Sequence, residues 1–137
     1  MDTVAEHTAA GDRQRSLVLV VEDRADLRLL CRVNLEFAGF RVVEAADAAG
    51  ALVAAGHEPP RALVLDLGLP DMDGWDLLDR LRTERQVVAP SVVVVTGRPI
   101  GPERRRARRE GVAALLAKPY LPSALVESVA SAAVATG

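Results

Sequence analysis

The chain has 137 residues, half of them apolar and 26% charged, which is the balance of one folded domain and not of a disordered chain. Lysine and arginine supply 17 positive charges against 19 carboxylates, and the formal net charge of −2 argues against a polycation built for nucleic acid. The single cysteine, Cys31, excludes an intramolecular disulfide, and no Cys/His cluster has zinc-ligand spacing. We therefore expect neither a secreted disulfide scaffold nor a zinc finger nor a multidomain enzyme.

Neither a membrane span nor a secretory signal is expected. The longest apolar runs, such as Leu17–Val21, are far shorter than a bilayer-crossing helix. The first fifteen residues are polar and lack the apolar core of a signal peptide. The sequence predicts a flexible N-terminal tail over residues 1–15 and one folded domain over residues 16–137, with a cytoplasmic location as the remaining expectation.

From Leu17 onward, short β-branched apolar runs alternate with amphipathic or alanine-rich segments. The runs predict five strands, at Leu17–Val21, Phe40–Ala45, Arg61–Leu67, Ser91–Val95 and Val112–Ala117. The other segments predict five helices, at Arg24–Phe37, Ala48–Ala55, Trp75–Thr83, Pro102–Glu110 and Pro122 to about Ala135. Continuous apolar strands are typical of a parallel sheet covered on both faces, and right-handed crossovers then make a doubly wound α/β fold.

Polar side chains follow the carboxyl ends of these strands, where ligands gather in an open α/β sheet. Glu22 and Asp23 follow the first strand, Asp66 ends the third, Thr96 and Gly97 follow the fourth, and Lys118 follows the fifth. The second strand offers only Glu44. Three carboxylates, one hydroxyl and one ammonium are therefore expected along one rim of the sheet.

Carboxylates crowded together repel, and a divalent cation relieves that repulsion. Oxygen ligands without His or Cys favour Mg²⁺. A carboxylate beside Mg²⁺ can attack phosphorus to form an acyl phosphate, and a hydroxyl and an ammonium can stabilise the charge that develops. Each residue alone also has a structural interpretation. Glu22 and Asp23 could begin a helix, Asp66 could be a turn residue, and Lys118 could be exposed to solvent. Their joint occurrence on one rim favours phosphoryl chemistry.

Four motifs resemble the receiver domain of two-component response regulators. They are VLVVEDRADLR at 18–28, LVLDLGLPDMDG at 63–74, VVVVTG at 92–97 and LLAKPY at 115–120. The resemblance spans about residues 16–135 and rests on all four motifs in order. It implies a five-stranded parallel sheet in the flavodoxin-like order 2-1-3-4-5 with five helices, and a receiver of the stand-alone single-domain type.

The resemblance also implies roles for individual residues. The implied phosphoacceptor is Asp66, with Thr96 contacting the phosphoryl group and Lys118 pairing with it. The implied Mg²⁺ site consists of Asp23 as a direct ligand, Glu22 acting mostly through metal-bound water, Asp66, and the backbone carbonyl of Gly68. A cis bond between Lys118 and Pro119 is implied as well.

Two features depart from the family pattern. Leu115 stands where the family usually has an aromatic side chain that swings inward on activation. The usual switch, in which this aromatic side chain follows the threonine, is therefore not carried over from the resemblance. Gly68 and Arg98 occupy two positions that, in the family, tune how fast the acyl phosphate hydrolyses. The resemblance therefore does not imply a lifetime for the acyl phosphate in this chain.

The leading hypothesis is a receiver that takes phosphate from a phosphohistidine on a sensor histidine kinase or a histidine phosphotransfer protein. It would catalyse only its own phosphorylation and dephosphorylation, without being a turnover enzyme, and would signal by changing an interaction surface. An output protein is expected to bind through Arg104, Arg105 and Arg108 of the basic segment, which is otherwise a solvated helix face; nucleic acid is a less favoured partner.

Two other functions are open at this point. A phosphate-independent interaction module on the same fold is favoured slightly by Leu115 and the basic segment, but the complete acidic, hydroxyl and lysine set argues against it. A phosphohydrolase with an Asp nucleophile would need a second Asp two residues after Asp66 as general acid, and Gly68 stands there.

Overall fold

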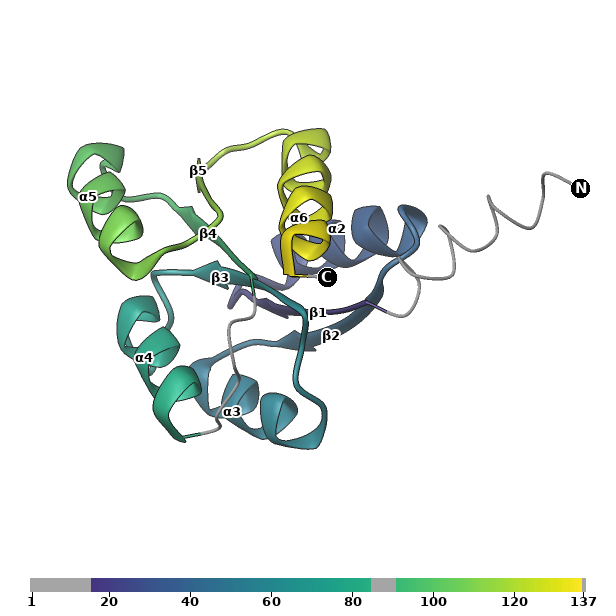
Figure 1. Ribbon diagram of the computed structural model, residues 1–137, viewed down its shortest axis with the longest axis horizontal. Coiled ribbons are helices and arrows are strands. Elements are labelled where there is room, and N and C mark those ends of the chain that lie inside the picture. Colours follow the sequence, from purple (N-terminus) through teal and green to yellow (C-terminus); the bar gives the residue numbers. More distant parts are fainter. Residues whose placement is uncertain (1–15, 85–90, 137) are drawn as a thin grey trace, which may run out of the picture.

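The computed structural model describes residues 16–84 and 91–136, so the expected tail over residues 1–15 lies outside the described residues. Its centre is a parallel five-stranded sheet in the order β2-β1-β3-β4-β5, which confirms the predicted strand order (Figure 1). The strands are β1 (Leu17–Val21), β2 (Arg41–Ala45), β3 (Ala62–Asp66), β4 (Ser91–Thr96) and β5 (Ala114–Ala117).

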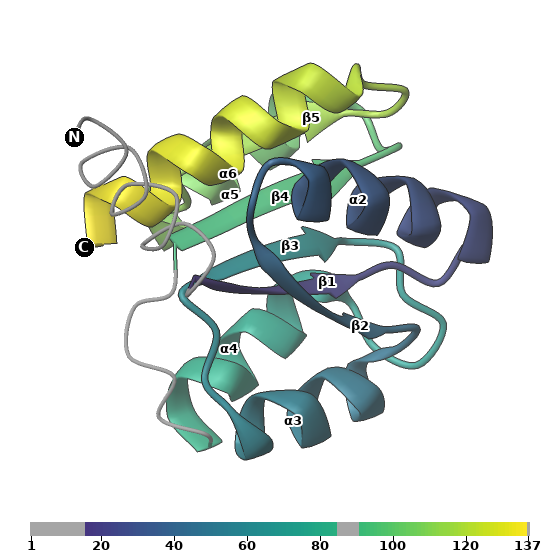
Figure 2. The same cartoon turned by 90° about the vertical axis from the view of Figure 1, so that its right-hand side faces the viewer.

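Within residues 16–84 and 91–136, five helices cover the two faces of this sheet, as predicted. They are α2 (Ala25–Phe37), α3 (Ala48–His57), α4 (Gly74–Glu84), α5 (Ile100–Glu110) and α6 (Pro122–Thr136). Helices α2 and α6 lie side by side on one face, and α3, α4 and α5 cover the other (Figures 1 and 2). None of the helices in the described part of the chain is long and apolar enough to span a membrane.

The alternation of side chains along the central strands builds a separate core under each helical layer. Leu19 and Leu65 point to the side of α3 and α4, whereas Val18 and Val64 point to the side of α2 and α6. Every residue of β1 and β3 is buried, which explains why both strands read as continuous apolar runs. The two cores hold the strand ends, and hence the polar rim, in a fixed register.

Capping and glycine residues set several of the helix ends. Asp47 caps α3, because its Oδ1 accepts a hydrogen bond of 2.7 Å from the Gly50 amide. Gly39 and Gly111 follow α2 and α5 with φ of 100° and 71°, in the left-handed region that only glycine enters without strain. Asp71, from the loop after β3, also accepts from the Ala48 and Ala49 amides at the start of α3, at 2.9 and 3.1 Å.

Some predicted boundaries were wrong by one or two residues. Helix α5 begins at Ile100, before Pro102, because the first amides of a helix have no intrahelical acceptor and proline is tolerated there. Helix α3 continues through Gly56 to His57. The fifth strand begins at Ala114 because the chain is still leaving the turn at Gly111.

The predicted apolar stripe of α2 is divided between the core and the surface. Cys31 and Leu35 are buried, but Leu30, Val33 and Phe37 are exposed by 42%, 54% and 94%. Helical spacing alone does not tell which apolar stripe of a helix faces the sheet. The described chain therefore carries an apolar ridge on the outside of α2.

Candidate functional site

Three of the predicted site residues meet at the carboxyl ends of β1 and β3. These strands pair in parallel with Val21 beside Leu65, which brings Glu22 and Asp23 next to Asp66. One carboxylate oxygen from each of the three lies within 4.8 Å of the others. Glu22 and Asp66 are buried, while Asp23 is exposed, so the cluster opens to solvent on one side.

Lys118 brings its ammonium into this cluster from the end of β5. Its Nζ donates a 3.0 Å hydrogen bond to Asp66 Oδ2 and lies 2.8 Å from Glu22 Oε1. Burial lowers the pKa of Lys118, but the bonds to both carboxylates outweigh this, and the net effect raises that pKa. The ammonium therefore stays charged and balances part of the acidic cluster.

The backbone around Lys118 fixes this placement. The peptide bond between Lys118 and Pro119 is cis, in agreement with the resemblance. The Lys118 amide donates to the Thr96 carbonyl at 2.8 Å, which ties the end of β5 to the end of β4. The position of Lys118 at the rim is thus fixed by the pairing of β5 with β4.

The cluster fits a divalent cation. Three carboxylates face one ammonium, so negative charge is in excess. Glu22 is 2% exposed, and this burial raises its pKa because the charged form loses solvation. Its Oε2 accepts from the Arg24 amide at 3.2 Å, and its buried Oε1 faces the Lys118 ammonium at 2.8 Å. An all-oxygen set of carboxylates with an excess of negative charge is suited to a hard cation such as Mg²⁺.

The loop after Asp66 is packed tightly against the acceptor. Asp66 Oδ1 accepts a 3.1 Å hydrogen bond from the Gly68 amide, so both carboxylate oxygens have donors. A Cβ on Gly74 would lie 2.6 Å from the Leu67 Cα and 2.8 Å from the Asp66 carbonyl oxygen. Only glycine fits at this position without moving the backbone of the acceptor itself.

Thr96 lies on the strand beside Asp66 and is 1% exposed. Its hydroxyl accepts a 2.9 Å hydrogen bond from the Arg98 amide, and within the described residues no hydrogen bond joins it to Asp66. The structure thus brings Glu22, Asp23, Asp66 and Lys118 together and places Thr96 next to them. Glu44, the acid of β2, is not part of the cluster, because it pairs with Arg32 at 2.6 Å and Arg28 at 3.6 Å.

The sequence reasoning missed Asp73 and the bonds that join it and Arg98 near the site. Arg98 Nη2 donates to Asp73 Oδ2 at 2.6 Å and to the Leu67 carbonyl at 3.1 Å, which joins the β4–α5 loop to the loop after the acceptor. Asp73 Oδ1 also accepts from the Trp75 amide at 2.9 Å and starts α4. The only signal in the sequence is the Asp-Met-Asp-Gly run after Pro70, where two acids follow the acceptor closely.

Comparison with known proteins identifies the family. The sequence model described as "Response regulator receiver domain" matches residues 18–130. The chain belongs to this family. The transcriptional regulatory protein KdpE of Mycobacterium tuberculosis is 39% identical over 105 residues, which are 77% of this chain and 45% of KdpE. The KdpE protein of Escherichia coli is 37% identical over 75% of this chain and 44% of its own length. This receiver domain spans about half the length of these curated relatives.

Solved structures agree on the fold. A sensor protein from Polaromonas sp. JS666 superimposes with a TM-score of 0.81 at 30% identity, covering 90% of this chain and 99% of the other. The chemotaxis response regulator CheY4 of Vibrio cholerae gives a TM-score of 0.78 at 24% identity, covering 85% and 98%. At that identity, the similarity to CheY4 concerns the fold alone.

The departures from the family pattern lie close to the site in this receiver domain. Leu115 on β5 is partly buried and packs against the core beneath α3, α4 and α5. A Cβ added to Gly97 would meet nothing within 4 Å, so the space beside Gly97 is open. The aliphatic side chain of Leu115 is therefore held in the core and does not bear a polar tip that could follow Thr96.

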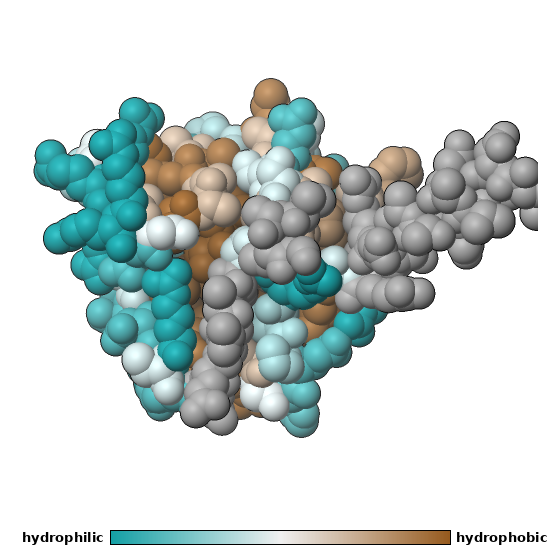
Figure 3. All heavy atoms as spheres, viewed as in Figure 1, coloured by the Kyte–Doolittle hydropathy of each residue, from teal (hydrophilic) through white to brown (hydrophobic). Residues whose placement is uncertain are grey.

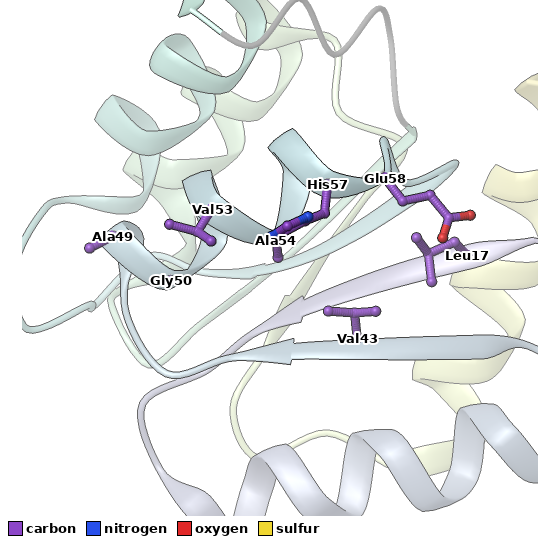
Figure 4. A pocket seen from close by; sticks show the side chains of 8 residues that line it. All are labelled: Leu17, Val43, Ala49, Gly50, Val53, Ala54, His57 and Glu58. Carbon is purple, nitrogen blue, oxygen red and sulfur yellow. The ribbon is translucent and has the colours of Figure 1, made fainter.

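A separate groove of about 580 Å³ lies between α3 and the β1–β2 edge of the receiver domain (Figure 4). Its lining is mainly apolar and includes Val43, Val53 and Ala54, with His57 and Glu58 at the end of α3. None of the rim carboxylates lines it, so it does not belong to the candidate site.

Proposed function

We propose that this receiver domain accepts a phosphoryl group on Asp66 from a phosphohistidine of a sensor histidine kinase or a histidine phosphotransfer protein. The observation that carries the proposal is the convergence of Glu22, Asp23, Asp66 and Lys118 at one rim. Glu22, Asp23, Asp66 and the Gly68 carbonyl would hold Mg²⁺, which when bound neutralises the phosphoryl oxygens.

The chemical step is an exchange of one bond to phosphorus for another. One oxygen of Asp66 forms the bond to phosphorus while the bond from phosphorus to the donor imidazole nitrogen breaks, and the electron pair stays on that nitrogen. Lys118 orients the Asp66 carboxylate at 3.0 Å and offers positive charge to the incoming oxygens. The Thr96 hydroxyl, on the adjacent strand, would donate a hydrogen bond to the phosphoryl group.

The domain is proposed to be no turnover enzyme and to catalyse only its own phosphorylation and dephosphorylation. Gly68 supports this, because it supplies no side-chain acid two residues after Asp66 that could protonate a leaving group. Steady hydrolysis of p-nitrophenyl phosphate, with many turnovers per Asp66, would contradict this part of the proposal.

The apolar ridge of α2 is proposed as the place where the phosphohistidine donor docks. Leu30, Val33 and Phe37 follow one another at helical spacing, and Leu121, 71% exposed, lies three residues after Lys118. Helix α2 begins two residues after Asp23, so its apolar ridge extends away from the acidic cluster along the outside of the helix. Replacing Val33 with Asp should slow transfer from a phosphohistidine protein but leave labelling by a small phosphoryl donor unchanged.

Signalling is proposed to occur in the cytoplasm, through an output protein that binds Arg104, Arg105 and Arg108. All three arginines are exposed on α5. The competing hypothesis is an interaction module that works without phosphate, and Leu115 in place of the usual aromatic is the observation that favours it.

One experiment separates the two hypotheses. The chain is incubated with Mg²⁺ and acetyl phosphate, and its intact mass is measured with and without EDTA. The proposal predicts a gain of one phosphoryl group that requires Mg²⁺ and is absent in Asp66→Asn. An unchanged mass, for a chain whose circular dichroism shows it folded, would favour the phosphate-independent module.

A further inference from the structure

The side chain of Arg28, near the start of α2, contacts the backbone of the acidic pair Glu22 and Asp23. Its Nη1 donates a 2.8 Å hydrogen bond to the Glu22 carbonyl and a longer one, of 3.4 Å, to the Asp23 carbonyl. One guanidinium nitrogen therefore joins two consecutive carbonyls in the segment between β1 and α2. That segment carries two of the three carboxylates of the acidic cluster.

Glu44, at the end of β2, holds the guanidinium of Arg28 in turn. Its Oε1 lies 3.6 Å from Arg28 Nε, and its Oε2 accepts a 2.6 Å hydrogen bond from Arg32, one helical turn further along α2. The carbonyl of the next residue, Ala45, accepts a 3.0 Å hydrogen bond from the Glu22 amide. The carboxyl end of β2 is thus linked to Glu22 twice, once through the backbone and once through Arg28.

The Asp23 carboxylate depends on this backbone for its position. It is exposed, and among residues 16–84 and 91–136 no hydrogen bond or ion pair reaches its oxygens. Glu22 and Asp66 differ from it, because Lys118 contacts their carboxylates at 2.8 and 3.0 Å. The place of Asp23 in the cluster therefore follows from its own main chain, which Arg28 contacts.

We propose that Arg28 is a positioning residue for the Mg²⁺ site and that Glu44 acts through it. The inference rests on the proposed function, since it concerns how the proposed ligands Glu22 and Asp23 are held. Removing a group that orients the ligands of a metal ion typically weakens metal binding about 10–100-fold. Glu44 thereby gains a role at the rim although it lies outside the acidic cluster.

The contacts of Arg28 are separate from the proposed output surface. Figure 3 shows strongly hydrophilic side chains gathered over α5, and α5 covers the face of the sheet opposite to α2 (Figures 1 and 3). The side chain of Arg28 is only 22% exposed, whereas the arginines proposed to bind the output protein are all exposed. A change at Arg28 therefore tests the acidic cluster and leaves the surface of α5 as it is.

A charge effect and a positioning effect of Arg28 have opposite signs. A guanidinium near a cation site repels the cation, so its removal would tighten Mg²⁺ binding if only its charge mattered. If Arg28 positions the acidic pair, its removal loosens Mg²⁺ binding, because the Glu22 and Asp23 carbonyls lose their donor. The direction of the change in Arg28→Gln separates the two effects.

The affinity is measured by titrating the isotope-labelled chain with MgCl₂ alone, without a phosphoryl donor. The NMR signal of the Gly68 amide reports binding, since this amide donates to Asp66 Oδ1 at 3.1 Å. We expect the dissociation constant for Mg²⁺ to rise about tenfold in Arg28→Gln. An unchanged or smaller dissociation constant would overturn the proposal.

Arg24→Gln is the matched control. It removes a positive charge from the residue next to Asp23, but the Arg24 side chain pairs with Asp26 at 2.9 Å, and its main-chain amide is kept. Mg²⁺ binding should therefore not weaken in Arg24→Gln. A tenfold loss in this variant as well would assign the effect to charge near the rim and contradict a specific role of Arg28.

Stability is separated from positioning in two ways. The NMR titration observes folded molecules, so a lower free energy of unfolding in urea does not by itself change the dissociation constant. If Arg28→Gln does not fold, Arg28→Lys takes its place. A lysine keeps the charge but cannot contact Glu44 and two carbonyls with one planar fork, so the dissociation constant should still rise. An unchanged value would overturn the proposal.

The role of Glu44 is tested with a double variant. If Glu44 acts through Arg28, adding Glu44→Gln to Arg28→Gln should weaken Mg²⁺ binding by less than about twofold beyond Arg28→Gln alone. Losses that multiply, as expected for independent residues, would contradict the part of the proposal that concerns Glu44.

Failure of this inference and failure of the proposed function give different results. Normal Mg²⁺ affinity in Arg28→Gln would overturn the role of Arg28 alone. A chain that binds no Mg²⁺ would overturn the proposed metal site, and this inference with it. A chain that binds Mg²⁺, with the expected loss in Arg28→Gln, but gains no phosphoryl group from acetyl phosphate would support this inference and overturn the phosphoacceptor assignment.

Discussion

Lys118 Nζ lies between Asp66 Oδ2, at 3.0 Å, and Glu22 Oε1, at 2.8 Å. It is the only lysine of the chain, and the other sixteen of the 17 Lys and Arg residues are arginine. A thin stem with a compact charge reaches a point between two buried carboxylates, where a planar guanidinium would need more room. This relationship makes the identity of the cation, and not only its charge, important for the site.

Replacing Lys118 with Arg should therefore impair phosphorylation although the charge is kept. We expect the initial rate of Mg²⁺-dependent labelling by acetyl phosphate to fall about tenfold or more, since the donor is no longer placed against the phosphoryl oxygens. Arg61→Lys, an exposed exchange of the same two residue types, is the control and should keep the full rate. A normal rate in Lys118→Arg would show that charge alone suffices.

Mg²⁺ should stabilise the folded chain, because it binds the native acidic cluster and not the unfolded chain. For a site with a dissociation constant of about 1 mM, 10 mM Mg²⁺ adds about 1.4 kcal/mol to the free energy of unfolding. That corresponds to a rise of about 3–5 °C in Tm, measured by differential scanning calorimetry.

The matched pair Asp23→Ala and Asp26→Ala locates this effect. Asp23 belongs to the acidic cluster, whereas Asp26 lies in the first turn of α2, where it pairs with Arg24 at 2.9 Å. Asp23→Ala should lose most of the Mg²⁺ response and Asp26→Ala should keep it. If the two variants respond alike, the ion binds elsewhere.

Gly74 should be far less tolerant of a methyl group than Gly97. A Cβ at Gly74 meets backbone atoms at 2.6 and 2.8 Å, but one at Gly97 meets nothing within 4 Å. Gly74→Ala should lower the free energy of unfolding by about 1–3 kcal/mol and slow labelling, because the Asp66 carbonyl must move. Gly97→Ala should change stability by less than about 0.5 kcal/mol in the same urea titration. Equal stabilities for the two variants would contradict the packing described for the acceptor loop.

Phosphorylation should change the fluorescence of Trp75, the only tryptophan. Its Nε1 donates to Glu103 at 2.8 Å, and the Arg98 guanidinium, 3.9 Å from Glu103, also holds Asp73. Since the Arg98 amide bonds the Thr96 hydroxyl, a pull on Thr96 moves this loop and the start of α5. The emission should shift on phosphorylation, less so in Arg98→Ala, and not at all in Asp66→Asn.

Leu115→Ala should reduce that fluorescence response less than Arg98→Ala does. Leu115 is held in the core and is aliphatic, so it offers no ring to follow Thr96. If Leu115→Ala abolishes the response and Arg98→Ala leaves it unchanged, the signal runs through β5 instead of the loop.

The rim could be predicted from the sequence because its residues sit directly at strand ends. Asp66 closes a buried apolar run and Lys118 follows another, so the parallel register alone brings them together. The Arg98–Asp73 bond could not be predicted, since it depends on two side chains of separate loops adopting compatible rotamers. The contact of Arg106 on α5 with the Trp75 ring, and the exposure of Phe37 on α2, likewise follow from packing and not from the spacing of residues in the sequence.

Locating the phosphoryl group on the chain is the sharpest test of Asp66 as the phosphoacceptor. The chain is labelled with acetyl phosphate and Mg²⁺ and then reduced with borohydride, which converts an aspartyl phosphate to homoserine, and its peptides are sequenced by mass spectrometry. We expect homoserine at position 66 and none in a sample treated with EDTA. Homoserine at another aspartate, or labelling that persists at the normal rate in Asp66→Asn, would contradict it.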